Sequence, residues 1–124
     1  TIIKARIGQG RYRELLKQKW NDMESISDYA NPDFMKASHI KPWKNCDNKE
    51  CIDPENGLLL KPDNDFLFDQ GYISFNDDGR IIISKMLSEQ DIQEFHLSEE
   101  IRIKQVTLKM KEYLNYHREN VFKK

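Results

Sequence analysis

Residues 56–71 read NGLLLKPDNDFLFDQG, and this stretch decides the fold expected for the chain. An Asn-Gly pair breaks the chain, and the three leucines that follow predict a short buried strand. Pro62 suits the first position of a helix and Gly71 suits its C-terminal stop, so residues 62–70 are expected to be helical. A buried strand that runs directly into a short acidic helix is therefore the centre of the predicted domain.

The segments on either side of this centre predict a mixture of helices and short strands. Asn76-Asp77-Asp78-Gly79 is a predicted hairpin turn, with Gly79 free to adopt a positive φ. Ser88 is the expected N-cap of a short helix. The remaining predicted elements are helices over residues 10–20, 89–95 and 107–121 and strands over residues 34–40, 72–75 and 80–84, with an exposed loop over 44–55.

Length and composition limit the class of protein. The 124 residues fit one domain over 1–124, and 38% hydrophobic content is enough for a folded core. The net charge of −1 excludes a uniformly basic nucleic-acid binder, so any basic patch must be local. The chain contains no long apolar run and no signal peptide, so we expect no membrane partner and a cytoplasmic location. Since it starts at Thr1 without a methionine, we expect a fragment of a longer protein.

The two cysteines, Cys46 and Cys51, lie close together in a loop-like stretch. A structural zinc site normally needs four ligands, and there is no second cysteine pair, so structural zinc is not expected. A local disulfide stays open, but free thiols in a reducing compartment are the prediction.

His39 is the first candidate for chemistry. It stands at the end of a predicted strand, where the strand can fix the ring while the following loop admits substrate. A neutral imidazole can take a proton from water near pH 7. A lone histidine is more often structural, so this residue alone does not decide the function. His117 lies on the apolar stripe of the last predicted helix and is expected to be a hydrogen-bonded core residue.

The short helix supplies a second candidate. Asp65 and Asp69 are four residues apart and share one helix face, where two like charges repel. Asp69 also lies near the C-terminal end, where a negative charge is disfavoured. A bound divalent cation or an arginine partner would explain this arrangement, and a solvated acidic face remains the alternative. Asn56 taken alone is typical of an ordinary turn.

In combination these features resemble the HNH endonucleases, in the branch found as restriction-endonuclease-like domains of bacterial and archaeal proteins. The order is a histidine at a strand end, a loop, an asparagine, and then a helix with an acidic residue nine places after the asparagine. Five blocks carry the resemblance in order: Gly8–Arg13, Ala37–Trp43, Asn56–Leu60, Leu67–Phe75 and Tyr113–Glu119.

The resemblance implies an α+β fold and a role for each matching residue. The expected fold is a ββα-metal core with an additional β-hairpin and flanking N- and C-terminal helices. His39 matches the general base that activates the attacking water. Asn56 matches the central asparagine, which holds the metal loop or ligates the metal. Asp65 matches the last histidine as a carboxylate ligand, Ser38 falls where relatives carry a metal ligand, and Asp69 is a further candidate ligand.

The implied activity is hydrolysis of phosphodiester bonds in DNA with Mg²⁺ or Mn²⁺. The implied setting is the effector domain of a prokaryotic restriction or antiviral defence protein, with an upstream recognition or regulatory domain outside this chain. A homodimer stays open. The expected DNA contacts are Arg6, Gln9, Arg11, Arg13, Lys41 and Lys44.

The sequence departs from the family pattern in two places. Many relatives carry a Cys-x-x-Thr-Gly block where this chain has Glu24-Ser25-Ile26-Ser27-Asp28, and Ser38 is a poor metal ligand. Two competing classes therefore stay open. One is a degenerate, non-catalytic nucleic-acid-binding module, which metal titration would separate from the enzyme. The other is a structural or protein-interaction domain, which would bind no DNA at low salt.

Overall fold

The computed structural model describes residues 2–124, with side chains from residue 8 onward. The chain is a mixture of helices and two small sheets, which confirms the α+β class. The helices are α1 (Ile2–Lys19), α2 (Pro62–Asp69), α3 (Glu89–Glu94) and α4 (Leu108–Asn120). The strands are β1 (Lys36–His39), β2 (Gly57–Leu60), β3 (Ile73–Phe75) and β4 (Ile81–Ile83). Short 3-10 turns cover Pro32–Phe34, Trp43–Asn45, Glu50–Ile52 and Pro54–Asn56.

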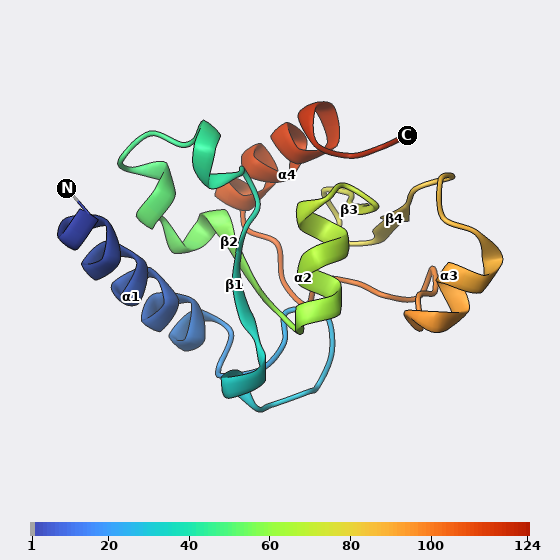
Figure 1. Cartoon of the computed structure of the whole chain (residues 1–124), viewed down its shortest axis with the longest axis horizontal. Helices are drawn as coiled ribbons and strands as arrows, with labels where there is room; N and C mark the ends of the chain where they lie inside the picture. Colours follow the sequence, from blue (N-terminus) through green and yellow to red (C-terminus); the bar gives the residue numbers. More distant parts are fainter. Residues whose placement is uncertain (1) are drawn as a thin grey trace.

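β1 and β2 pair antiparallel at the centre of the molecule, with His39 opposite Gly57. In Figure 1 these two strands run between α1 on one side and α2 on the other. All four residues of β2 are buried, including the three leucines, because both of its faces are covered. The predicted buried run after Asn56 is confirmed.

Gly57 allows α1 to approach this sheet closely. A Cβ at position 57 would lie 2.1 Å from the hydroxyl oxygen of Tyr12 and 2.8 Å from Cδ2 of Leu16. The Tyr12 hydroxyl donates a hydrogen bond to the carbonyl of Asn56, over 2.7 Å. The glycine is thus needed for space, since its φ of −162° is ordinary extended backbone.

α2 begins at Pro62 and ends one residue before Gln70, close to the predicted 62–70. Its N-cap residue, Lys61, provides no side-chain cap. Glu24, which is fully buried, takes that role from a distant part of the chain. Its carboxylate accepts hydrogen bonds from the Lys61 amide and the Asn64 side chain, both at 2.9 Å.

The second sheet and α4 complete the fold. β3 pairs antiparallel with β4 across a turn in which Gly79 has a φ of +89°, as the sequence predicts. α4 packs against β3 and is capped by Thr107, whose side chain accepts from the Met110 amide. His117 is fully buried on α4, and its prediction as a hydrogen-bonded core histidine is confirmed.

Three boundaries differ from the sequence-based expectation. The first helix runs from Ile2 rather than residue 10, so Gly8 and Gly10 lie within the helix despite their low helix propensity. The predicted strand 34–40 is shorter, since Phe34 belongs to a 3-10 turn capped by Asn31. The loop 44–55 contains three 3-10 turns instead of irregular chain.

Two smaller expectations concern the cysteines and membranes. Cys46 and Cys51 are free thiols, as predicted. Within residues 2–124, no helix combines the length and the apolar character needed to span a bilayer.

Candidate active site

His39 is held at the end of β1 by contacts on three sides. Its ring stacks on Tyr12 of α1, with ring centroids 4.2 Å apart and an interplanar angle of 10°. Trp43 contacts it edge-on, with centroids 5.7 Å apart. Its Nε2 atom lies 2.9 Å from the carbonyl oxygen of Cys51. The imidazole therefore has a fixed plane and a fixed rotation within that plane.

The Cys51 contact also fixes the tautomer of His39. A carbonyl oxygen only accepts hydrogen bonds, so Nε2 of the neutral ring must carry the proton and donate it. Nδ1 is then the basic nitrogen, and it makes no hydrogen bond to any residue whose side chain or backbone the structure describes. Burial lowers the pKa of His39 from its ordinary value of 6.5, against an opposing effect of the Cys51 carbonyl. The ring is thus neutral at pH 7 and able to accept a proton at Nδ1.

Asn56 ties the loop after β1 to the start of β2. Its side chain is fully buried, and its Oδ1 accepts a hydrogen bond from the Lys41 amide over 2.7 Å. Its Nδ2 lies 3.1 Å from the Glu50 carbonyl and 3.3 Å from both the Lys41 carbonyl and the Cys46 sulfur. These contacts shape the loop that presents the Cys51 carbonyl to His39.

Ser38, Asp65 and Asp69 form a second group, which we name the β1–α2 oxygen cluster. Ser38 is buried next to His39 on β1, and its hydroxyl hydrogen-bonds to the half-buried carboxylate of Asp65. Burial raises the pKa of Asp65, the Ser38 hydroxyl opposes this shift, and the negative charge of Asp69 adds to it. The Asp65 carboxylate thus has little positive charge around it, with Lys36 as the one cation that lowers its pKa.

The oxygen cluster suits a hard divalent cation better than a soft one. Mg²⁺ is usually held by one or two carboxylates and keeps several waters, which matches two aspartates and a hydroxyl. Among residues 8–124, no three His, Cys, Asp or Glu side chains are grouped to hold an ion, so a closed all-protein cage is not formed there. The donor set therefore fits a partly hydrated Mg²⁺ or Mn²⁺ and does not fit structural zinc.

The model of the HNH endonuclease family matches residues 24–76. This segment, a little under half of the chain, is similar to the HNH endonucleases. No curated protein matches the chain.

The matching segment, residues 24–76, contains the whole candidate site except the Tyr12 ring that stacks on His39. It runs from Glu24 to Asn76 and so includes β1, β2, α2 and β3. Tyr12, which stacks on the histidine, comes from α1 outside the match. A helix outside the matching segment, α1, therefore contributes to the geometry of the site.

Residues 24–28, where the chain lacks the Cys-x-x-Thr-Gly block, make their own set of buried polar contacts. Besides its bonds to α2, Glu24 accepts a hydrogen bond from Ser27. Ser25 is fully buried, its hydroxyl accepts from the Leu59 amide over 2.8 Å, and its amide donates to the Leu59 carbonyl over 2.8 Å. These contacts fasten residues 24–25 to β2 and α2 without a cysteine.

The basic residues selected from the sequence lie in different surroundings. Arg13 donates to the carbonyls of Pro32 at 2.6 Å and Met35 at 2.9 Å, so its guanidinium holds the chain before β1. Lys41 pairs with Glu50 over 2.9 Å and lies over the Tyr116 ring. Arg11 and Lys44 are exposed, and Gln9 is partly buried on α1. The side chain of Arg6 lies outside the described residues.

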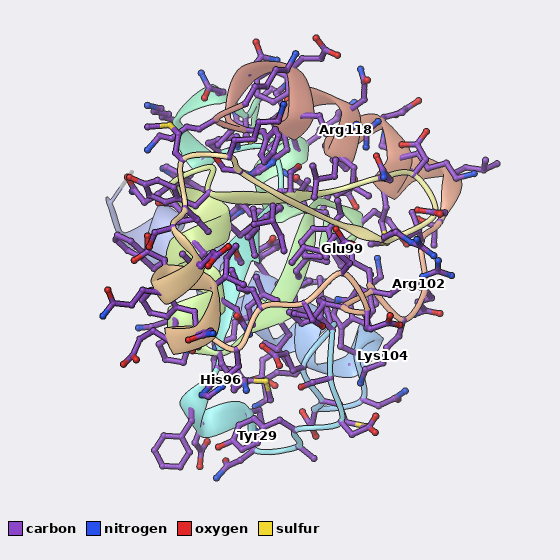
Figure 2. The ribbon with its side chains drawn as sticks, turned by 90° about the vertical axis from the view of Figure 1, so that its right-hand side faces the viewer. Tyr29, His96, Glu99, Arg102, Lys104 and Arg118 are labelled. Carbon is purple, nitrogen blue, oxygen red and sulfur yellow. The ribbon has the colours of Figure 1, made fainter. Side chains whose placement is uncertain are left out.

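The third histidine, His96, lies in surroundings unlike those of His39. His96 is exposed and has a positive φ of 54°. In Figure 2 it lies at the opposite end of the view from Arg118 on α4. It is a suitable control position for experiments on His39.

Sequence reasoning missed two groups that set the geometry of His39. Tyr12 reads as one member of the apolar stripe on the first helix, and no local pattern shows that its ring also supports a histidine 27 residues later. The Cys51 carbonyl is a backbone group and leaves no trace in residue type. A tyrosine instead of an aliphatic residue on a stripe facing a polar loop was the only available signal.

Proposed function

We propose that this protein is a divalent-metal-dependent endonuclease that hydrolyses phosphodiester bonds in DNA, with His39 as the general base. The observation that carries the proposal is the hydrogen bond from His39 Nε2 to the Cys51 carbonyl, which leaves Nδ1 unprotonated on a rigidly held ring. In this proposal β1, β2 and α2 form a ββα-metal core, with β3 and β4 as an additional hairpin.

In the proposed mechanism, Nδ1 of His39 removes a proton from the water that attacks phosphorus. The resulting imidazolium keeps its hydrogen bond to the Cys51 carbonyl, which offsets part of the cost of charging a buried ring. Tyr12 keeps the ring in plane during this step. Asn56 acts as a positioning residue, since its side chain holds the 41–51 loop and is buried among protein partners.

The β1–α2 oxygen cluster is the proposed metal site. Asp65 and Asp69 would hold the cation and Ser38 would complete the group from β1. When bound, the cation would relieve negative charge on the phosphate and on the leaving oxygen. Support comes from the raised pKa of Asp65, because burial and the negative charge of Asp69 disfavour its ionised form when no cation is bound.

The DNA contacts of the proposal rest on exposed basic residues of α1 and of the loop after β1. Arg11 and Lys44 are exposed and suited to phosphate contact, together with Gln9 and the Arg6 position. Arg13 and Lys41 are engaged within the protein and are proposed to position these segments. Service as the effector of a restriction or antiviral defence protein rests on family analogy alone.

A plasmid-cleavage assay with Mg²⁺ or Mn²⁺ tests the proposal. We expect His39→Ala to lower the cleavage rate by about 100- to 10,000-fold, the usual contribution of a general base. The matched control is His96→Asn, which retains a side chain that tolerates the positive φ at that position. EDTA should abolish cleavage by the unmodified protein and by the control alike. Undiminished cleavage by His39→Ala would remove the base assignment.

One observation favours a second candidate, a non-catalytic nucleic-acid-binding module. Ser38 is buried and its hydroxyl is already engaged with Asp65, so the cluster has two carboxylates and no histidine to hold a cation. In that case the protein would retain DNA in EDTA at low salt, and neither metal would produce cleavage. Failure to bind DNA at low salt would instead support a structural or protein-interaction role.

A further inference from the structure

A cleft of about 740 Å³ opens beside the candidate active site. One wall is residues 42–45, directly after β1. The opposite wall is α4 with the segment that follows it, and the C-terminal end of α2 closes one side. In Figure 1 the loop between β1 and β2 lies against α4, which agrees with the packing of α4 on Pro54–Asn56. The proposed function uses only Lys44 and Asp69 of its lining and assigns the cleft itself no ligand.

Trp43 links the cleft to His39. Its side chain is 46% exposed on the cleft wall, so its ring is open to a ligand there. The same ring contacts the His39 ring edge-on, with centroids 5.7 Å apart. A flat group stacked on Trp43 would therefore lie beside the residue that contacts the proposed general base.

The rest of the lining has the chemistry of a nucleotide site. Amide side chains of Asn45, Gln70 and Asn120 line the cleft and can hydrogen-bond to a base edge. Gln70 already donates to Asp69 and Asn120 to the Tyr116 carbonyl, so these two offer mainly their amide oxygens as acceptors. Lys44 and Lys123 add positive charge, against one carboxylate from Asp69. This combination of an aromatic plane, amides and net positive charge matches a base with its phosphate, and it matches an apolar ligand poorly.

We propose that this cleft binds an unstacked nucleobase next to the scissile phosphate, with Trp43 as the stacking platform. This inference rests on the proposed nuclease function and adds its substrate class, a strand with unpaired nucleotides. A base inside a continuous duplex must leave its stack before it can reach the cleft. Single strands, bulges and mismatches therefore bind and are cut in preference to perfect duplex.

Tryptophan fluorescence tests the stacking directly and needs no catalysis. The chain has two tryptophans, and Trp20 is 4% exposed, so quenching by an added oligonucleotide reports on Trp43. In EDTA, a single-stranded oligothymidylate should quench the fluorescence of the unmodified protein. Trp43→Leu should weaken single-strand binding by about tenfold or more, because base–aromatic stacking is lost. Duplex affinity should change little.

The matched control is Phe34→Leu, which removes another exposed aromatic ring, on the turn before β1. It should bind single strands like the unmodified protein. The inference is overturned by an absence of quenching, or by equal losses of single-strand and duplex affinity in Trp43→Leu. Unchanged emission from Trp20 and an unchanged circular dichroism spectrum establish that this variant is folded.

The same titration separates this inference from the proposed function. Quenching without cleavage in Mg²⁺ or Mn²⁺ supports the cleft as a base site and removes the nuclease proposal. Cleavage that shows no preference for unpaired strands removes the cleft proposal and retains the nuclease. A parallel titration with oligouridylate distinguishes the two sources of an unpaired base, and binding of that RNA in place of DNA would overturn the DNA assignment.

Discussion

His39 and His117 are bound in nearly the same way, and one atom separates their roles. Each ring stacks on an aromatic side chain at an interplanar angle of 10°, and each Nε2 contacts a backbone carbonyl. Nδ1 of His117 lies 2.7 Å from the Ser74 hydroxyl in a fully buried site. Nδ1 of His39 has no such partner among the described residues. The free nitrogen, rather than the burial, is what suits His39 to proton transfer.

The lowered pKa of His117 predicts that the free energy of unfolding depends on pH. Burial lowers its pKa to about 4, whereas an unfolded chain has an ordinary value of 6.5. Between these values the unfolded state binds the extra proton, so stability falls as the pH drops from 6.5 towards 4. The loss reaches about 3 kcal/mol below pH 4, and the full stability is present above pH 6.5.

Urea unfolding of the unmodified protein and His117→Gln across this pH range measures the effect. The variant should be less stable at pH 7, and its stability should fall less steeply between pH 6.5 and 4.5. Comparison with the variant isolates His117 from the other groups with shifted pKa values. Parallel pH profiles for the two proteins would contradict the assignment.

At the scale of elements, the helix that carries the aspartates depends on a residue 37 positions before its cap. Lys61 gives α2 no side-chain cap, and the Glu24 carboxylate accepts the Lys61 amide and fixes Asn64 instead. Ser25 adds two hydrogen bonds to Leu59 in β2. Glu24 and Ser25, in the loop after α1, thus fix β2 and α2 relative to each other. This placement brings Asp65 next to Ser38.

We predict that Glu24→Ala destabilises the protein by about 3 kcal/mol, because the Asn64 side chain, the Lys61 amide and the Ser27 hydroxyl lose their acceptor. Glu99→Ala is the matched control, since Glu99 is exposed on the face shown in Figure 2 and should change stability little. Urea unfolding of both variants provides the measurement. Equal stability of Glu24→Ala and the unmodified protein would mean that other contacts hold the start of α2.

At the scale of the whole molecule, the two flanking helices converge on the segment before β2. Lys19 of α1 pairs with Glu55 over 2.7 Å, and Thr107 at the start of α4 donates to the same carboxylate. Tyr113 donates to Asp53 over 2.7 Å. Residues 53–55 are therefore held by α1 on one side and by α4 on the other. Their geometry depends on parts of the chain that are far apart in sequence.

The proposed metal site predicts that divalent cations raise the global stability. Binding to the folded state alone stabilises it in proportion to the logarithm of cation concentration. Excess Mn²⁺ should raise the melting temperature of the unmodified protein and of the control Asp63→Asn, which alters an exposed position on α2. Asp65→Asn should show no such rise.

In EDTA, Asp65→Asn should be at least as stable as the unmodified protein. The substitution removes a half-buried charge and its repulsion from Asp69, both of which raise the pKa of Asp65. Differential scanning calorimetry with and without Mn²⁺ measures both effects. An equal Mn²⁺ response in Asp65→Asn and the control would exclude Asp65 as a ligand.

The sequence by itself determined the features that depend on near neighbours. The leucine run after Asn56, Pro62 at the start of α2, the Gly79 turn and the Ser88 cap all lie where local rules place them. The buried His117 followed from its position on an apolar helical stripe. Each of these depends on backbone preferences or side-chain periodicity over a few residues, so the sequence alone was enough.

Only the tertiary structure decided how the candidate site is built. Residues from α1, β1 and the 41–51 loop meet at His39, and the proton on Nε2 is set by a backbone carbonyl. Arg13, expected on DNA from its charge alone, is held by the carbonyls of Pro32 and Met35. The cleft beside Trp43 exists because α4 packs next to the loop. These features arise from packing between distant segments, for which residue type and spacing carry no local signal.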